Sequence, residues 1–174
     1  MILALLLTGS MLTSSIACKE QEPPPTPRQE EETSFSLISG LSADQSVTVA
    51  ELGYPDHFFI IIDPSTSDRI ERWTYFSQGR ALDFDNGRLL GEEEIEDESE
   101  DYPPTDLRPQ DFDALLTPME AEQLLGPSKY TQEVTESLMP ENTIIVFDDA
   151  VLIYRDEQFV SVDTQVKPPD IPTP

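Results

Sequence analysis

The hydrophobic and polar positions of the chain fall into two blocks, and each block begins with a pattern that predicts a short helix. Ser-Ala-Asp-Gln at 42–45 and Thr-Pro-Met-Glu at 117–120 are capping boxes. In such a box the first side chain accepts a hydrogen bond from a backbone amide and the fourth returns one. Gly53 and Gly126 predict the helix ends, because glycine adopts the left-handed conformation that a helix end favours.

After each glycine the pattern changes to short runs of aromatic and β-branched residues, which are typical of β-strands. Asn86-Gly87 predicts a tight hairpin, and its segment 84–90 aligns without a gap with 154–160. We therefore expect an α+β fold of two tandem units, 35–91 and 109–165, each a short helix packed on a three- to four-stranded antiparallel sheet. The expected strands are 57–62, 72–76, 81–84, 88–90, 129–134, 143–147, 151–154 and 158–162.

Three motifs of the first block follow one another in the order of a known domain family. They are Leu-Gly-Tyr-Pro at 52–55, Trp-Thr-Tyr at 73–75 and Phe-Asp-Asn-Gly at 84–87. This order resembles the SmpA/OmlA (BamE-like) lipoprotein domain and the repeat of β-lactamase-inhibitory-protein-like domains. The second block is a degenerate copy, with the region of Ile145 in place of the tryptophan and Glu157 in place of the hairpin glycine. The resemblance implies helices on one face of an antiparallel sheet, and protein binding through the exposed sheet face rather than catalysis.

A short apolar leader, 1–17, precedes the single cysteine of the chain, Cys18. Its apolar core is too short for a spanning helix, and with Ala17 before the cysteine it resembles the signal peptide of bacterial lipoproteins. The resemblance implies lipidation of Cys18 and an exported, membrane-anchored lipoprotein. Lys19 stands where aspartate is the familiar retention signal, which favours the periplasmic face of the outer membrane in a host with two membranes. No Lys or Arg precedes the leader core, and a start further upstream would account for that.

The segment after Cys18 is charged and rich in proline, so it cannot enclose the thiol in a core, which is the alternative role of a lone cysteine. We expect 18–34 to be a disordered tether, of which 19–33 spans roughly 40–45 Å at about 3.1 Å per residue. We expect 166–174 to be a disordered tail. The chain has 35 acidic and 10 basic residues, and its net charge of −25 opposes binding to nucleic acid. The same charge favours a basic protein partner.

The two units are joined by an expected acidic linker, 92–108, whose block 92–101 has the like charges of solvated, disordered chain. Capture of Ca²⁺ by these carboxylates is one alternative, because hard cations prefer oxygen ligands, and an acidic arm that binds a basic partner is another. The segment from Asp83 to Arg88 begins like a calcium loop, but its glycine falls one position early, and a hairpin explains it better. We predict no metal site and no cofactor.

Trp73 and Tyr75 are the most informative aromatic residues, because in a strand they share one face. They are core residues or, if they face solvent, an interface anchor. His57, the single histidine, is expected to begin a strand, and without a second His or Cys it forms neither a metal site nor a catalytic triad. The chain carries no phosphate-binding loop or nucleophile motif, so we expect no enzyme.

The function expected from these patterns is that of a protein-binding or envelope-assembly module, non-catalytic and attached to a membrane through lipidated Cys18. The alternative is a lipoprotein that binds a small hydrophobic or cationic ligand, or Ca²⁺ through its acidic linker. The two differ in what the folded part presents to its surroundings, a surface for a protein or a cavity for a ligand.

Overall fold

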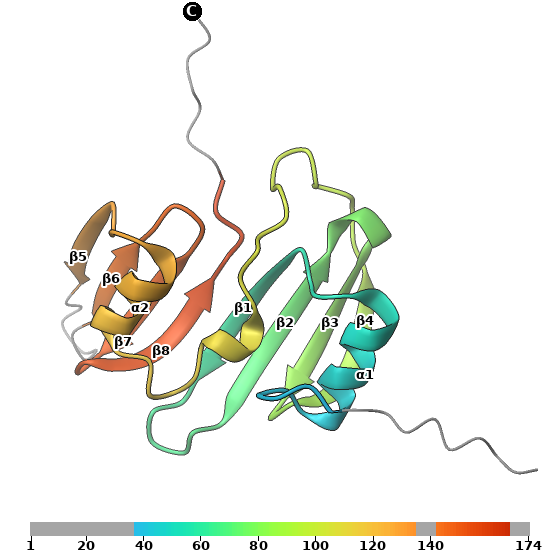
Figure 1. Ribbon diagram of the computed structural model, residues 1–174, viewed down its shortest axis with the longest axis horizontal. Helices are drawn as coiled ribbons and strands as arrows, with labels where there is room; N and C mark the ends of the chain where they lie inside the picture. The colour runs from blue at the N-terminus through green and yellow to red at the C-terminus, as the bar shows by residue number, and fades with distance from the viewer. Residues whose placement is uncertain (1–36, 135–141, 168–174) are drawn as a thin grey trace, which may run out of the picture. The chain divides into compact units, whose positions relative to one another are not determined.

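The computed structural model describes residues 37–134 and 142–167, which form one eight-stranded antiparallel sheet (Figure 1). The strands lie in the order β4-β3-β2-β1-β8-β7-β6-β5, so two four-stranded meanders meet where β1 lies beside β8. Each meander follows a short α-helix in the chain. The elements are α1 (Ala43–Leu52), β1 (His57–Ile62), β2 (Arg69–Tyr75), η1 (Phe76–Gln78), β3 (Arg80–Asp85), β4 (Arg88–Glu94), η2 (Pro109–Asp111), α2 (Pro118–Leu125), β5 (Tyr130–Val134), β6 (Asn142–Val146), β7 (Val151–Arg155) and β8 (Gln158–Asp163).

The expected fold class, two tandem α+β units, is wrong, because the two meanders are hydrogen-bonded into one sheet that carries only two short α-helices. The described chain is therefore mostly β. The junction is antiparallel, with Phe59 opposite Asp163 and Ile61 opposite Ser161. Separate units would have left β1 and β8 as open edges, and their pairing satisfies those backbone amides and carbonyls.

Both helices begin and end where the sequence predicted. The Ser42 side chain accepts a bond from the Gln45 amide at 3.1 Å, and the Ser42 amide donates to Gln45 Oε1 at 3.0 Å. The capping box of Thr117 and Glu120 is also complete. Each helix ends at its expected glycine, which has a positive φ, so both helix predictions are confirmed.

The eight expected strands are all present, but β4 is longer than predicted. It continues to Glu94, so the first three residues of the acidic block 92–101 belong to a strand rather than to solvated coil. Cationic partners explain the difference. Arg80 of β3 forms an ion pair with Glu92, and Arg72 of β2 forms one with Glu93, so both carboxylates lie beside positive charge on the sheet.

The hydrophobic core lies between the sheet and the layer formed by α1, η2 and α2, which cover one face of the sheet (Figure 1). Alternation along β1 shows the division, because Phe58, Ile60 and Ile62 are buried under this layer. The opposite face, here called the open face, carries Phe59 and Ile61. The largest buried side chains of the core are Trp73, Tyr75, Tyr154, Phe58, Phe84, Phe112, Phe147, Phe159, Ile60, Leu152, Glu71 and Val162.

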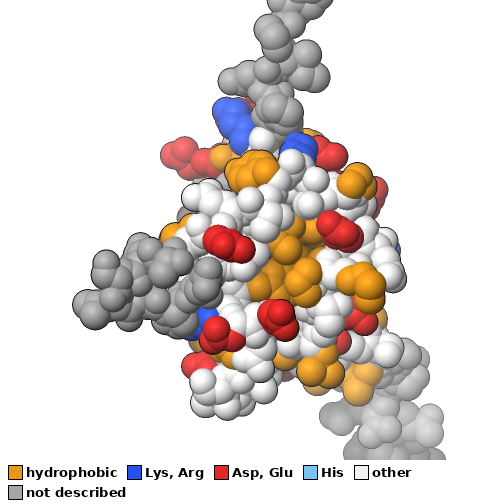
Figure 2. All heavy atoms as spheres, turned by 90° about the vertical axis from the view of Figure 1, so that its left-hand side faces the viewer, with side chains coloured by type: hydrophobic (Ala, Val, Ile, Leu, Met, Phe, Trp, Pro, Cys, Tyr) orange, Lys and Arg blue, Asp and Glu red, His pale blue; other side chains and the backbone are white. Residues whose placement is uncertain are grey.

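The surface at the β5 end of the sheet combines apolar and acidic side chains. Figure 2 views the molecule from that end and shows apolar side chains gathered in the middle, with Asp and Glu side chains spaced around them. None of the helices in the described ranges is long and apolar enough to cross a membrane.

Candidate functional site

The residues singled out in the sequence lie in different places. Cys18 and the tether lie outside the described residues. Trp73 and Tyr75 are buried side by side in the core, facing the helices, which is the first of the two alternatives for them. Tyr75 donates its hydroxyl to the Gly53 carbonyl at 3.1 Å, and burial raises its pKa. Neither side chain is exposed, so neither contributes to the open face.

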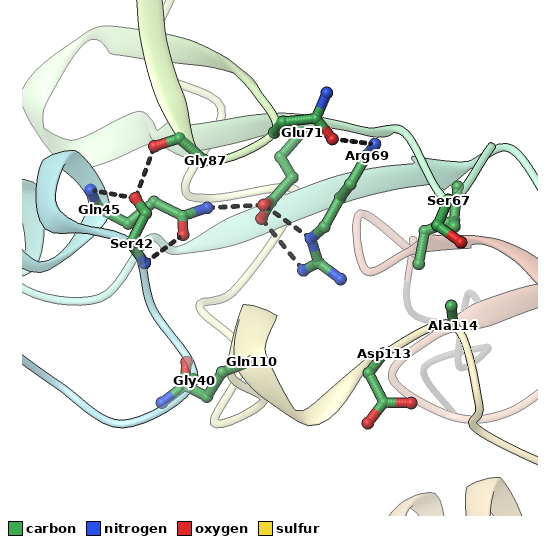
Figure 3. A pocket seen from close by; sticks show the side chains of 12 residues that line it. Gly40, Ser42, Gln45, Ser67, Arg69, Glu71, Gly87, Gln110, Asp113 and Ala114 are labelled. Atoms are coloured by element: carbon green, nitrogen blue, oxygen red, sulfur yellow. Dashed lines mark hydrogen bonds and ion pairs between the residues drawn. The ribbon is translucent and has the colours of Figure 1, made fainter.

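Glu71 is a buried carboxylate that the sequence analysis did not single out, and its side chain is 1 % exposed. Figure 3 shows it with Gln45 and Arg69. Gln45 Nε2 donates to its carboxylate at 2.6 Å, Arg69 Nε at 2.7 Å and Trp73 Nε1 at 3.0 Å. A signal for it was present in the sequence. Arg69, Glu71 and Trp73 are two residues apart along β2, so their side chains share one face.

Arg69 connects this carboxylate to η2. Besides its ion pair with Glu71, its guanidinium donates to the Pro109 carbonyl at 2.8 Å and to the Phe112 carbonyl. The cluster therefore ties three elements together, α1 through Gln45, β2, and the 3-10 turn that covers the middle of the sheet. A carboxylate whose oxygens already accept bonds from three side chains suits a structural role better than that of a general base, and this cluster is called the Glu71 clasp below.

A cavity of about 470 Å³ lies beside the clasp, within the size range of small-molecule sites (Figure 3). Its polar groups are mostly bonded to one another. Ser42 donates to the Gly87 carbonyl at 2.5 Å, and the Gln45 amide group bonds both Ser42 and Glu71. Gln110 Oε1 is the one atom on its lining that is buried without a hydrogen-bond partner in the described structure. This arrangement fixes how α1 sits on the sheet and offers few free polar groups to a ligand.

His57 begins β1, as expected, and is buried where the chain from β4 passes the end of the sheet. Its Nδ1 lies 2.9 Å from the Thr164 carbonyl and its Nε2 lies 3.2 Å from the Tyr102 carbonyl. The ring of Tyr102 stacks on Phe76, so the histidine helps to hold the second part of the acidic linker against the sheet.

The segment that resembled a calcium loop is a hairpin. Asn86 and Gly87 have φ values of 49° and 78°, which are the positive angles that a tight hairpin turn requires. Asp83 lies 3.3 Å from the Arg72 guanidinium, and Asp85 accepts a bond from Asn86. No group of three or more His, Cys, Asp or Glu side chains in the described ranges is arranged to hold a metal ion.

The open face carries an exposed apolar stripe at its centre. Phe59, Ile61 and Ile70 are 39 %, 42 % and 47 % exposed, and Ile61 lies directly opposite Ile70 in the β1–β2 ladder. Residues paired across a ladder point to the same face. The stripe is bounded on both sides by acids, with Asp85 opposite Ile70 and Asp163 opposite Phe59.

The side chains around the stripe are mainly acidic, and an arginine compensates part of their negative charge. Burial raises the pKa of Asp163, and Arg72, opposite Phe59, is shared between Asp83 and Glu93. The open face is therefore an apolar surface in an acidic frame. No family model, no curated protein and no solved structure matches this chain.

Proposed function

We propose that the chain is a non-catalytic protein-binding module of the cell envelope, which presents the open face of its sheet to a basic protein partner. The observation that carries the proposal is the adjacent exposure of Phe59, Ile61 and Ile70 on the sheet face opposite the described helices. Contiguous apolar side chains rimmed by polar groups are typical of protein interaction sites.

The acidic frame supports a basic partner. The chain has a net charge of −25, and the acids at the border of the stripe include Asp85 and Asp163. Such a field accelerates encounter with a positively charged surface and repels acidic proteins, nucleic acid and anionic lipid. Burial of the apolar stripe then supplies most of the affinity, while the charges select the partner.

Attachment to a membrane through lipidated Cys18 is the second part of the proposal. It rests on the apolar leader before Cys18 and on the proline-rich tether after it. Stable anchoring needs more than one acyl chain, which the lipoprotein resemblance implies. Envelope assembly is the role suggested by the BamE-like resemblance, on the periplasmic face of the outer membrane where the host has two membranes. A lipid anchor would hold the acidic module near the membrane while its charge keeps it off anionic headgroups.

Photo-crosslinking in intact cells tests the binding face. A benzoylphenylalanine at Phe59 should give a covalent adduct with a discrete protein, because this side chain is the exposed ring of the stripe. The matched control is the same probe at Leu115, which is 84 % exposed but precedes α2 on the other side of the sheet. Equal protein labelling from both positions, or labelling of lipid alone from position 59, would show that the open face is not a protein-binding site.

The anchor is tested by Cys18→Ser. The wild-type chain should fractionate with membranes and the variant should become soluble or remain unprocessed, because serine has no thiol to accept lipid. Metabolic labelling with an alkyne fatty acid gives an independent measurement. If the variant stays in the membrane fraction and the wild type takes up no label, Cys18 is not an anchor.

A further inference from the structure

The two edges of the sheet, β4 and β5, differ in how they are protected. In the described ranges each has a single strand neighbour, β3 for β4 and β6 for β5. An edge strand presents unpaired N–H and C=O groups to any extended chain that approaches, and native proteins usually block this with charges, bulges or covering elements.

The β4 edge has all three of these devices. Glu92, Glu93 and Glu94 follow one another along it, and its ladder with β3 contains a register shift. The helix α1 also covers part of it, since the Leu89 amide donates to Asp44 Oδ2 at 2.9 Å. A second strand would have to displace this bond and approach three carboxylates.

Within the described residues the β5 edge has no bulge and no covering element, and its charge is low. Its sequence, Tyr-Thr-Gln-Glu-Val at 130–134, contains one charge and no proline or glycine. Its ladder with β6 runs from Tyr130 to Val134 without a register shift. Its first four residues are exposed, and Tyr130 is 57 % exposed although it is aromatic.

The side chains beside β5 indicate what a strand placed there would contact. Across the sheet, Tyr130 lies opposite Val146, and Val146 lies opposite Val151, so these side chains form one row of the open face. Gln132 begins a second row with Ile144. From this end the molecule shows apolar side chains at the centre and acidic side chains around them (Figure 2).

We infer that β5 is a docking edge for an extended basic segment of a partner protein, which adds to the sheet as a further strand. The backbone of β5 supplies the hydrogen bonds, and alternate side chains of the incoming segment extend the rows that begin at Tyr130 and Gln132. Its basic residues complement Glu133 and the net charge of −25. The same charge opposes a second copy of this chain as the occupant. This inference rests on the proposed function, because both require a protein as the partner.

The probe is an acetylated and amidated peptide of alternating Lys and Val residues, added to the full chain in neutral detergent. Strand addition predicts slower amide hydrogen exchange within 130–134 and backbone contacts by NMR between the peptide and β5. Two N-methylated peptides with the methyl groups on alternate residues sharpen the test. One set of amides would point to β5 and the other away, so one peptide should bind and the other should not.

Two charge reversals separate strand addition from general attraction. Glu133→Lys and Glu94→Lys change the net charge equally but lie on opposite edges, and both side chains are exposed. We expect Glu133→Lys to weaken the peptide about tenfold and Glu94→Lys to weaken it less than about twofold, because charges act mainly at the contact. Equal losses, no protection within 130–134, or protection that depends on protein concentration alone, which marks a second copy, would overturn the inference. The crosslink from position 59 does not involve β5, so it reports on the proposed function separately.

Discussion

The two halves of the sheet repeat one plan of elements, but matched positions carry different chemistry. Each half has a register shift at the same point, before Phe84 in β3 and before Tyr154 in β7. Glu71 lies opposite Phe84, and the corresponding residue of the second half, opposite Tyr154, is Thr143. The backbone repeat is therefore close, while the buried carboxylate of the first half has no counterpart in the second.

The two halves hold their helices against the sheet in different ways. In the first half the cap residue Gln45 reaches into the core and bonds Glu71, so the helix is tied to the sheet by polar contacts. In the second half the bonds that the described residues make to Glu120 come from its own cap, Thr117, and Ile145 stands where the first half has Trp73. Helix α2 therefore depends on apolar packing, and α1 on packing and a buried network.

Removal of the Glu71 carboxylate should give the largest decrease in the free energy of unfolding. Glu71→Ala leaves the Arg69 guanidinium, the Trp73 indole and the Gln45 amide without their acceptor, so we expect the free energy of unfolding to fall by about 3–5 kcal/mol. The matched variant Thr143→Ala should cost about 1 kcal/mol or less. Urea denaturation followed by tryptophan fluorescence measures both. Similar losses in the two variants would mean that the clasp contributes no more than ordinary packing.

The hairpins of the two halves provide the next comparison. Gly87→Ala should destabilise by about 2–3 kcal/mol, because φ is +78° and a Cβ there would lie 2.6 Å from the Ser42 Cβ. Glu157 has a positive φ of 65° without being glycine, so Glu157→Gly should stabilise by up to about 1 kcal/mol. Thermal unfolding measures the two changes, and they should have opposite signs. A destabilising Glu157→Gly would show that its side chain is needed in the turn.

Inside the core, the two halves differ by the hydroxyl group of Tyr154. It is buried without a hydrogen-bond partner in the described structure, and the matched residue of the first half is Phe84. Tyr154→Phe should therefore raise the free energy of unfolding by about 1 kcal/mol, since it removes a desolvated polar group. The reverse exchange, Phe84→Tyr, should lower it by about 1–3 kcal/mol. A loss of stability in Tyr154→Phe would indicate that the hydroxyl is bonded in solution.

Local features of this fold could be predicted from the sequence, and long-range ones could not. The capping box at Ser42 and the stop at Gly53 are formed by residues within one helix, so their pattern is complete in a short segment. The pairing of β1 with β8 joins Phe59 to Asp163, and no short pattern encodes such a register. A signal was present nevertheless, because the run from His57 to Ile62 is apolar on both faces, as expected of a central strand.

The candidate site was predictable only in part, for the same reason. The sequence left Trp73 either in the core or at an interface, and the structure places it in the core. Glu71 was not predicted to be buried because its compensating partners come from α1 and η2 as well as β2. The apolar stripe also depends on the long-range sheet. Ile70 becomes part of it only when β2 pairs with β1 and the helices take the other face.

The two helix caps differ in a small contribution to stability, and this contribution depends on pH. In α1 the returning group is the amide of Gln45, which does not titrate, and in α2 it is the carboxylate of Glu120. The Thr117 amide and hydroxyl lower the pKa of Glu120 by donating to it. A lowered folded-state pKa means that the carboxylate stabilises α2 above its ordinary pKa, and this contribution is lost as the pH falls through the lowered value.

Glu120→Gln converts the second cap into the chemistry of the first, and an amide oxygen still accepts the bond, as it does at Ser42. Relative to the wild type, the variant should therefore be slightly less stable at pH 7 and equally stable once Glu120 is protonated. Chemical denaturation of both proteins at pH 7 and below the pKa measures this difference, in which the other carboxylates cancel. An unchanged difference between the two pH values would mean that Glu120 does not act as a charged cap, and that the caps of the two halves are equivalent in chemistry as well as in position.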